Sequence, residues 1–558
     1  MHLARLLAAV SLAAPLIGQT SPGYRIAGTV VDHRTKAALA SVLVTIRAAN
    51  SRAAEPAETL TDTSGHFQFF NLSAGKYTLS AQRRGGHPHQ FEQRGQFLTA
   101  IVTGPGLDSE HIIFALPAES RISGFVRDDD GDPVSGATVH LLHRQVFDGK
   151  QSVQLQGQSM TTASGAFHFP HLAAGTYYLA AAARPWYAQR PAYFTESFGQ
   201  LTKTGTSIPA PGLDMAFPMT YSGDVTDPNA AQAIVLPEGS NVTSQIVLHA
   251  VPAQHLSLPE PDMQQQSGNR PRLMPGIGVN VVGPGGVILS SPAETPQRPA
   301  PDEGGTPEQE IYGLAPGTYR MQQYTFKMGG NAHPGSELLV TVGSGGASVS
   351  KASVTRIQGK VSYEGAAPTK GSEENLGLQF AGDTARSFAF VEESGTFTVQ
   401  NALPPGQYRI SIVNGTGGLA VRSVNQHPGS TITISDSAPE ALELNLTLGP
   451  ASTSSLSGFA INEGTPVPGA MVLLLSNDDG TGWIGRDQSD SDGSFTIPNV
   501  EAGRYKLLAI DQAESGGDEL EYRNPAVLKK YLGAAQAVDV PLPARQALSV
   551  QVVPRGAN

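Results

Sequence analysis

One hairpin pattern, repeated along the chain, constrains the fold more than any other feature of the sequence. In its C-terminal copy, at 490–509, the letters are DSDGSFTIPNVEAGRYKLLA. Two turns that contain glycine each precede a run in which apolar and polar residues alternate. Glycine accepts the positive φ of a tight turn, and alternation with a period of two is typical of a half-buried strand. The pattern therefore predicts a β-hairpin, and its repetition predicts a chain made of copies of one β module.

The copies of this hairpin share their turn glycines and two aromatic positions. Three further copies lie at 61–81, 161–181 and 393–411, and a degraded copy at 310–320 keeps only the second turn. A phenylalanine follows the first turn glycine by two residues, and a tyrosine follows the second by two. We expect both rings in the core of each module, with the tyrosine hydroxyl bonded to the backbone at its rim. These residues are Phe67, Phe167, Phe397, Phe495, Tyr77, Tyr177, Tyr408 and Tyr505.

Alternating strands precede and follow each hairpin, so the hairpins also indicate where the domains lie. Each resulting module has the size of an antiparallel β-sandwich of about seven short strands. The sequence therefore predicts an all-β fold, a tandem array of about five Ig-like antiparallel sandwiches joined by short linkers like beads. The expected modules span 22–117, 118–251, 252–354, 355–450 and 451–558, and the third is degenerate.

Composition agrees with a strand-and-turn protein and limits its partners. The chain has 62 glycines and 41 prolines, and only 15% of its residues are charged. A net charge of −11 argues against nucleic acid or anionic lipid as a partner, since both require a basic face. The absence of cysteine excludes disulfides, thiolate catalysis and cysteine-ligated metals.

The N-terminal residues 1–20 have the layout of a secretory signal peptide. His2 and Arg5 form a short polar region, and the run Leu6–Ile17 that follows is almost wholly apolar. A buried helix or an uncleaved anchor is the alternative, but the run is short for a bilayer span and Pro15 interrupts it. No later stretch is a transmembrane candidate. We therefore expect an exported protein of the periplasm, the cell surface or the extracellular space.

The repeated motifs resemble a known domain family. The runs G-x-V/F-x-D, P-V-x-G-A-x-V and D-x-x-G-x-F-x-I-x-x-L-x-A-G-x-Y-x-L are similar to the carboxypeptidase regulatory-like domain. That domain is a transthyretin-like sandwich among the carbohydrate-binding-like folds, and bacterial Cna-B modules are its relatives. The resemblance covers modules one, two and five best and module three least. It implies a secreted bacterial multidomain protein whose modules are accessory, binding or spacer domains without peptidase activity.

No stretch of the sequence carries a catalytic motif. The chain has no H-E-x-x-H, no G-x-S-x-G elbow and no G-x-x-x-x-G-K-[ST] phosphate loop. The histidine pairs His87/His89 and His140/His143 are expected at surfaces or edges, because residues three apart on a strand face opposite sides. We therefore expect a protein that is not an enzyme and holds no cofactor, with Ca²⁺ as the one exception to consider.

Two acidic turns are the candidate calcium sites. Ca²⁺ takes six to eight oxygen ligands, which Asp-rich turns can supply. The simpler explanation is that Asp and Gly are favoured in hairpin turns, and the spacing of an EF-hand is missing. The candidate ligands are Asp128, Asp130 and Asp132 in module two, and Asp487, Asp490 and Asp492 in module five.

Aromatic residues in two long loops are the candidate ligand-binding residues. The loop Pro185–Phe198 is the richest, and Trp483 lies in a loop of module five. Exposed rings of this kind can bind the faces of sugars, but we favour the alternative that the loop folds back and covers an open sheet edge. The candidate residues are Trp186, Tyr187, Tyr193, Phe194 and Trp483.

Taken together, these features predict a non-enzymatic exported protein that serves as a binding or spacer array, with polysaccharide as the ligand class that the resemblance suggests. The alternative is a structural or assembly protein of the cell envelope, which acts through protein–protein contacts. Exposed coplanar rings would favour the first function, and a shielded aromatic loop would favour the second.

Overall fold

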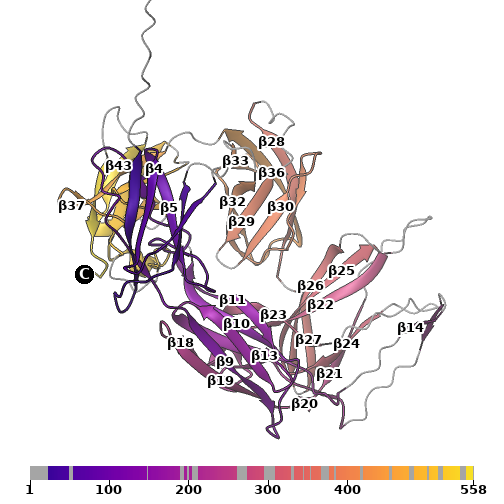
Figure 1. Cartoon of the computed structure of the whole chain (residues 1–558). Coiled ribbons are helices and arrows are strands. Elements are labelled where there is room, and N and C mark those ends of the chain that lie inside the picture. The colour runs from indigo at the N-terminus through magenta and orange to yellow at the C-terminus, as the bar shows by residue number, and fades with distance from the viewer. Residues whose placement is uncertain are drawn as a thin grey trace, which may run out of the picture. The chain divides into compact units, whose positions relative to one another are not determined.

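In the described residues, nearly all of the regular secondary structure is β-strand, arranged in two-layer sandwiches, which confirms the expected all-β tandem array (Figure 1). The predicted signal peptide lies outside the residues that this computed structural model describes. None of the helices in the described part of the chain has the length and apolar character that crossing a bilayer requires. The described residues are 23–49, 55–147, 149–188, 194–197, 200–203, 212–259, 273–293, 308–327, 332–343, 345–351, 353–365, 376–382, 385–414, 419–450, 455–476, 483–498, 500, 502–512, 519–540 and 548–556.

The chain divides into two compact units, which we describe separately. The first unit comprises the N-terminal sandwich, within 1–93 and 98–116, together with Asp490–Asp492. The second comprises 94–97, 117–489 and 493–558, and it contains the other four sandwiches. Each unit thus includes a short segment that lies far away in the sequence.

The first sandwich has one sheet in the order β4-β1-β8 and another in the order β3-β2-β5-β6, with β7 also paired to β5. Val30, Ile46, Phe67 and Leu79 are buried between the two sheets. Its strands are β1 Tyr24–Asp32, β2 Leu43–Ala48, β3 Ala57–Leu60, β4 His66–Leu72, β5 Gly75–Gln82, β6 His89–Gln90, β7 Ile101–Thr103 and β8 Ile112–Leu116.

The second and third sandwiches follow without a long connection. The second pairs the sheet β12-β9-β19 with the sheet β11-β10-β13-β17, and the third pairs only β21-β24 with the sheet β23-β22-β25-β26-β27. The elements of the second are β9 Ser120–Asp128, β10 Thr138–Phe147, β11 Lys150–Met160, β12 Ala166–Leu172, β13 Gly175–Ala182, β14 Phe194–Ser197, β15 Gln200–Lys203, β16 Met215–Ala216, β17 Thr220–Tyr221, η1 Pro228–Ala230, β18 Ile234–Leu236, β19 Asn241–Leu248 and β20 Val251–Pro252. Those of the third are β21 Gln254–Pro259, β22 Leu273–Val282, η2 Pro284–Gly286, β23 Ile288–Ser290, β24 Glu308–Leu314, β25 Gly317–Lys327, β26 Ala332–Gly343 and β27 Gly346–Lys351.

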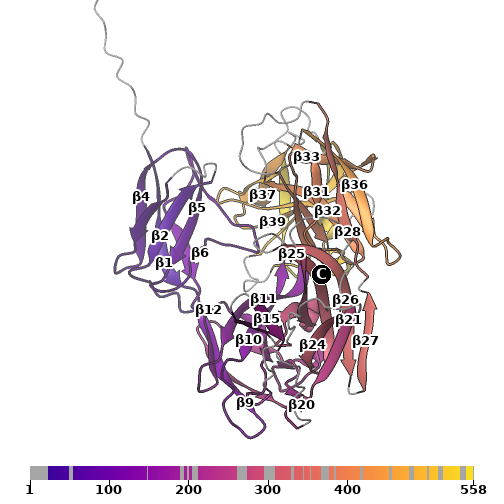
Figure 2. The ribbon, with the colours of Figure 1, turned by 90° about the vertical axis from the view of Figure 1, so that its right-hand side faces the viewer.

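The fourth and fifth sandwiches, labelled in Figure 2, share a central three-strand order with the second, whereas their other strands differ: the fourth adds β33 and β34 to its first sheet, and the strands of the fifth join into one eight-stranded sheet. The orders β3-β2-β5, β11-β10-β13, β30-β29-β32 and β40-β39-β42 correspond to one another. The strands of the fourth are β28 Arg356–Tyr363, β29 Gly377–Gly382, β30 Arg386–Phe390, β31 Thr396–Thr398, β32 Gly406–Asn414, β33 Leu419–Val424, β34 His427–Pro428, β35 Thr431–Ile434 and β36 Ala441–Pro450. The elements of the fifth are β37 Leu456–Asn462, β38 Thr465–Pro466, β39 Met471–Ser476, β40 Trp483–Gln488, β41 Ser494–Ile497, β42 Gly503–Ile510, α1 Pro525–Leu528, η3 Leu532–Ala534, β43 Gln536–Val540 and β44 Ser549–Val553.

Most of the repeated hairpin aromatics are buried as the sequence predicts, whereas Tyr77 and Tyr505 are only partly buried against the cores. Phe67, Phe167, Phe397 and Phe495 are all at most 3% exposed. The hydroxyl of Tyr177 donates to the carbonyl of Ala173, four residues earlier, over 2.9 Å. Burial raises the pKa of Tyr177 to about 12, so this hydroxyl stays a donor at neutral pH. The same bond, to the residue four positions earlier, is made by Tyr77, Tyr319 and Tyr408.

A glycine in the first strand lets the first and last strands of a sandwich pair closely. These strands, β9 and β19 in the second sandwich, pair in parallel, whereas a purely antiparallel sandwich was expected. A Cβ atom at Gly124 would lie 1.8 Å from the carbonyl oxygen of Ser244 on the neighbouring strand. The ring of Phe167 covers the same glycine from the core side, 2.7 Å from that Cβ position. The equivalent glycines are Gly28, Gly359 and Gly458.

The outward face of the second sandwich is buried in the hydrophobic core of the third, which we call the shared core, so the expectation of separate beads is wrong for this pair. Alternate residues of β10 face opposite ways: Leu141 packs into the second sandwich's own core, and Leu142 packs against the third sandwich. Leu142 and Ala180 belong to one cluster with Leu289 and Met321 of the third sandwich. In Figure 1, β10 and β13 lie beside β23. The third sandwich needs this cover, because its second sheet has only two strands against five.

The fifth sandwich also buries both faces of a sheet, but it uses its own chain to do so. The run Met471–Leu475 is buried throughout, because odd-numbered residues face outward and even-numbered residues face the core. A cover segment, residues 519–535, packs Leu520, Tyr522, Leu528 and Tyr531 onto the outward face. A strand that is buried on one face alternates between apolar and polar residues. This strand is apolar at every position, which is the pattern expected when both faces are buried.

Replacing Gly124 by Ala tests the close pairing of first and last strands. The added methyl group would collide with the backbone of β19, and overpacking of this kind costs about 1–3 kcal/mol. Hydrogen-exchange mass spectrometry on the full chain should show faster exchange in β9 and β19. Gly157→Ala is the matched control, because a Cβ there meets nothing within 4 Å. Equal exchange in the two variants would contradict the role assigned to Gly124.

Candidate functional site

The aromatic loop of the second sandwich begins in a tight turn directly after β13. The N–H of Ala188 donates to the carbonyl of Pro185 over 3.0 Å, which places Trp186 and Tyr187 at the tip of the turn. Trp186 is 81% exposed, and its ring meets that of Tyr187 edge to face at 5.8 Å. The indole thus lies at the surface, and its role as a ligand-contacting residue stays a prediction. It does not lie flat beside Tyr187, so the two rings do not form a coplanar platform.

The other predicted aromatic residues lie apart from this turn or outside the described residues. Phe194 is the first residue of β14 and Trp483 the first of β40, and the placement of both side chains is outside the described part. Tyr193 lies outside it altogether. The exposed site that the structure does describe is therefore the Trp186 turn, and the wider aromatic site remains a prediction.

The acidic turn of the second sandwich uses one carboxylate to close itself. Oδ1 of Asp128 accepts hydrogen bonds from the N–H groups of Asp130, at 3.2 Å, and Asp132, at 2.9 Å. This is the turn-closing use of Asp that sequence reasoning offered as the simpler explanation. The side chains of Asp130 and Asp132 are exposed. Calcium binding at this turn stays a prediction.

The acidic residues of the fifth hairpin serve as acceptors for backbone and lysine donors. Asp487 accepts from the N–H groups of Gln488 and Thr496, at 2.8 and 2.6 Å. Asp490, which belongs to the first unit, accepts the N–H of Ala100 at 3.0 Å and forms an ion pair with Lys76. A calcium ion at Asp490 would have to displace these donors. Asp492 follows in the same turn, and its role as a ligand stays a prediction.

Equivalent positions in two hairpins have opposite environments. Asp62 caps its own turn, where bonds from Ser64 and from the N–H of His66 lower its pKa. Asp490 occupies the same place in the fifth copy, but burial raises its pKa, and the bond to Lys76 offsets this only in part. Aspartate at the same repeat position thus closes its own turn in one hairpin and pairs with a distant lysine in the other. The sequence pattern alone does not reveal this difference.

His140 is the buried titratable group that sequence reasoning placed wrongly. It was expected at a surface or edge, but it is fully buried on the face of β10 that meets the third sandwich. Its Nδ1 lies 3.3 Å from the carbonyl of Ala180 and its Nε2 lies 3.0 Å from the hydroxyl of Ser290. A neutral ring satisfies both partners, with Nδ1–H donating to the carbonyl and Nε2 accepting from the serine. Burial lowers the pKa of His140 accordingly. The neighbouring His143 stacks on Tyr177 at 4.4 Å.

A buried ion pair in the second unit was also missed by sequence reasoning. Arg486 and Glu519 pair with side chains that are 0% and 2% exposed. Cζ of Arg486 lies 4.3 Å from the centre of the Phe97 ring and 5.4 Å from the centre of the Tyr522 ring. Rings on a desolvated arginine stabilise its charge, and a buried pair of this kind is costly to break. The pair is enclosed by protein, so it acts within the fold and offers no surface to a substrate.

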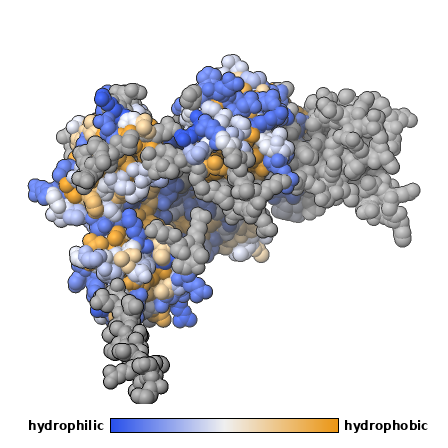
Figure 3. All heavy atoms as spheres, turned by 90° about the horizontal axis from the view of Figure 1, so that it is seen from above, coloured by the Kyte–Doolittle hydropathy of each residue, from blue (hydrophilic) through white to orange (hydrophobic). Residues whose placement is uncertain are grey.

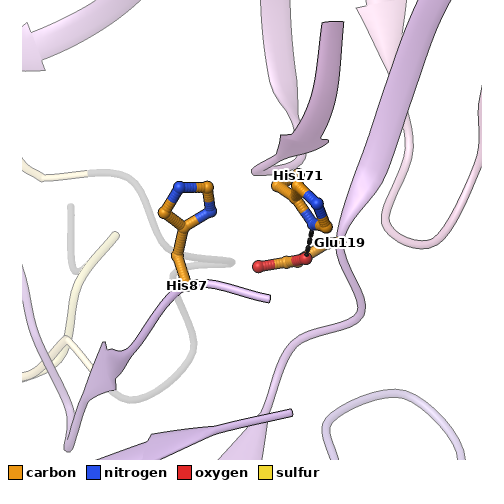
Figure 4. A group of neighbouring side chains, drawn as sticks. All are labelled: His87, Glu119 and His171. Carbon is orange, nitrogen blue, oxygen red and sulfur yellow. Dashed lines mark hydrogen bonds and ion pairs between the residues drawn. The ribbon is translucent and has the colours of Figure 1, made fainter. Parts of the chain in front are cut away.

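Figure 4 shows a further pair of charged side chains, His171 and Glu119 of the second unit. Nδ1 of His171 lies 2.5 Å from a carboxylate oxygen of Glu119, and the pair joins the end of β12 to the segment before β9. His87, also drawn there, belongs to the first unit. His171 is exposed and Glu119 is half-buried, and the pair connects β12 to the residue that precedes β9, its neighbour in the sheet.

Comparison with known families identifies two of the modules. The sequence profile of the carboxypeptidase regulatory-like domain matches residues 25–103 and 121–200. These two segments are carboxypeptidase regulatory-like domains. The resemblance seen in the repeated motifs is thereby confirmed for the first and second sandwiches. No curated protein matched the chain.

Solved structures with similar sandwiches include three bacterial pilins. The minor pilin GBS52 of Streptococcus agalactiae is 14% identical, with a TM-score of 0.21, and the match covers 41% of this chain and 97% of the pilin. The major pilin SpaD of Corynebacterium diphtheriae is 9% identical at a TM-score of 0.14, covering 60% and 98%. BcpA, the major pilin subunit of Bacillus cereus, is 10% identical at 0.13, covering 60% and 99%. Likeness at this level does not bear on function.

Acidification tests the position of His140. The pKa of His140 in the folded chain lies below its ordinary value of 6.5, because burial disfavours the charged ring. The unfolded chain therefore takes up a proton more readily, and the free energy of unfolding decreases as the pH falls below 6.5. Hydrogen exchange in β10 and β23 of the full chain should therefore speed up between pH 7.5 and 5.5, after correction for intrinsic rates. His140→Gln should show less of this increase, whereas His111→Gln, which changes an exposed histidine, should show all of it. An equal increase in all three proteins would contradict the assignment.

Proposed function

We propose that this chain is a non-enzymatic, exported binding and spacer protein built from carboxypeptidase regulatory-like sandwiches. The shared core of the second and third sandwiches carries the proposal, because it makes a stiff two-sandwich segment out of modules that would otherwise move as separate beads. A spacer needs such stiffness to hold a binding surface at a fixed place. The proposed export rests on the layout of residues 1–20.

The way charged and aromatic residues are used supports a non-catalytic role. The repeated phenylalanines and tyrosines fill cores, the buried pair Arg486–Glu519 is enclosed, and His140 is bonded on both ring nitrogens. An active site needs such groups beside a space that a substrate can enter. A hydrolase activity that purifies with the chain would contradict this proposal.

Two binding modes remain candidates for the array. The exposed indole of Trp186 favours contact with a polysaccharide, because indole rings stack on the apolar faces of sugars. Protein–protein contact is the alternative. Figure 3 shows hydrophobic residues among hydrophilic ones on the side in view, which is compatible with such contact. Interfaces between proteins commonly have this mixed character.

A glycan array with the full chain and its Trp186→Ala variant tests the first mode. If Trp186 stacks on a sugar, the substitution should weaken binding at least about tenfold, the equivalent of ~1.4 kcal/mol. Phe70→Ala is the matched control, because Phe70 is a 52% exposed ring in the first sandwich and should not matter. Binding that is indifferent to Trp186→Ala would remove the turn as the sugar site and leave protein contact as the favoured mode.

A further inference from the structure

The tip of the β10–β11 hairpin in the second sandwich is buried by the cover segment of the fifth. The tip of a hairpin ordinarily lies at the surface, in contact with solvent. Gly149, at this tip, is buried instead. The N–H of Arg523, in the cover segment, donates to the carbonyl of Gly149 over 3.0 Å. Both sandwiches belong to the second unit, so this contact lies within one compact unit of the chain.

The contact requires glycine at the hairpin tip for two reasons. The φ of Gly149 is +73°, in the left-handed region that glycine adopts without steric cost. A Cβ atom at this position would lie 2.6 to 2.7 Å from three ring carbons of Tyr522, namely Cδ2, Cε2 and Cζ. The backbone of the turn therefore lies directly on the ring, closer than any side chain would permit. Tyr522 is 0% exposed.

The cover segment is also anchored to its own sandwich on both sides of the contact. Before the contact, Glu519 pairs with Arg486 of β40, and both side chains are buried. After it, Leu528 is buried on the outward face of the fifth sandwich, and the hydroxyl of Tyr531 accepts the N–H of Gly556 over 3.2 Å. A segment held in this way presents the Tyr522 ring to the second sandwich as a fixed surface.

The hairpin connects this surface to the shared core. β10 and β11 are paired along their whole length, from Thr138↔Met160 to Phe147↔Lys150. Leu142 of β10 lies in the shared core, and seven residues of extended strand, about 23 Å, separate it from Gly149. A Cβ atom at Gly285 of the third sandwich would lie 3.2 Å from Cβ of Val153 on β11. The paired strands thus contact the third sandwich along their length and the cover segment at their tip.

We propose that the cover segment locks the fifth sandwich to the second by holding the tip of the β10–β11 hairpin, so that the two sandwiches open locally together. The inference rests on the stiff spacer role proposed above and extends it, because it adds the fifth sandwich to the stiff segment formed by the second and third. A cover segment that only filled the outward face of the fifth sandwich would be indifferent to the hairpin tip.

Hydrogen-exchange mass spectrometry on the full-length Gly149→Ala variant tests the proposal. The added methyl group would collide with the Tyr522 ring, so peptides from 519–535 should exchange at least about tenfold faster. Gly136→Ala is the matched control, because Gly136 lies just before β10 with a φ of +72° and a Cβ there meets nothing within 4 Å. Both variants strain a left-handed turn, but only Gly149→Ala should loosen the cover segment. Slow exchange in β9 and β44 shows that both sandwiches remain folded.

Cross-linking gives a second measurement that leaves Gly149 unchanged and therefore decides the matter if Gly149→Ala does not fold. The chain has no cysteine, so Lys150→Cys combined with Arg523→Cys introduces its only two thiols. A short bismaleimide should join them within one chain, because the two positions adjoin the hydrogen bond between Arg523 and Gly149. Met160→Cys combined with Arg523→Cys is the control, since Met160 lies about 33 Å further along β11.

Two results would overturn the inference. The first is equal exchange of 519–535 in Gly149→Ala and Gly136→Ala. The second is cross-linking of the 150–523 pair that is no faster than cross-linking of the 160–523 pair. Either result would leave the shared core, and with it the proposed function, intact, because neither Gly149 nor Tyr522 belongs to that core.

Discussion

The apolar face that the second and third sandwiches share is the contact on which the second unit depends. A five-stranded sheet cannot be covered by the two strands β21 and β24, so the third sandwich does not bury its core alone. The outward side chains of β10 and β13 supply what is missing, and the cluster around Leu142, Leu289 and Met321 is buried as a result. The degenerate hairpin of the third module is therefore tolerated, because its neighbour supplies part of its core.

The outer face of the corresponding sheet is where the modules differ. It is polar in the first sandwich, where Thr45 and Thr78 are only half-buried, and it is apolar and covered in the second and fifth. In the fourth it carries two exposed rings and two arginines. The fold of each module is held by residues that repeat, so residues on this outer face can change without loss of the sandwich. Specific function in such an array is expected on this face and in the long loops.

The repeated part of the structure could be predicted from the sequence, because its determinants are local. Turn glycines, alternating strands and the two hairpin aromatics all act within about twenty residues of one another. Burial at His140 could not be predicted, since its partner Ser290 lies 150 residues away. Nor could the pairing of Asp490 with Lys76, 414 residues away, because Asp62 has the same place in its hairpin and caps its own turn. The run Met471–Leu475, apolar at every position, was the available signal of two-sided burial.

The central claim is that the second and third sandwiches fold as one body, and one measurement tests it most directly. Leu289→Ala removes a fully buried side chain from the third sandwich's part of the shared core, at a cost of about 2–5 kcal/mol. Hydrogen exchange on the full chain should then rise in β10 and β13 of the second sandwich as well as in β22 and β25. Leu378→Ala, an equally buried leucine of the fourth sandwich, should raise exchange only within the fourth. Exchange that stays confined to the third sandwich in Leu289→Ala would contradict the shared core.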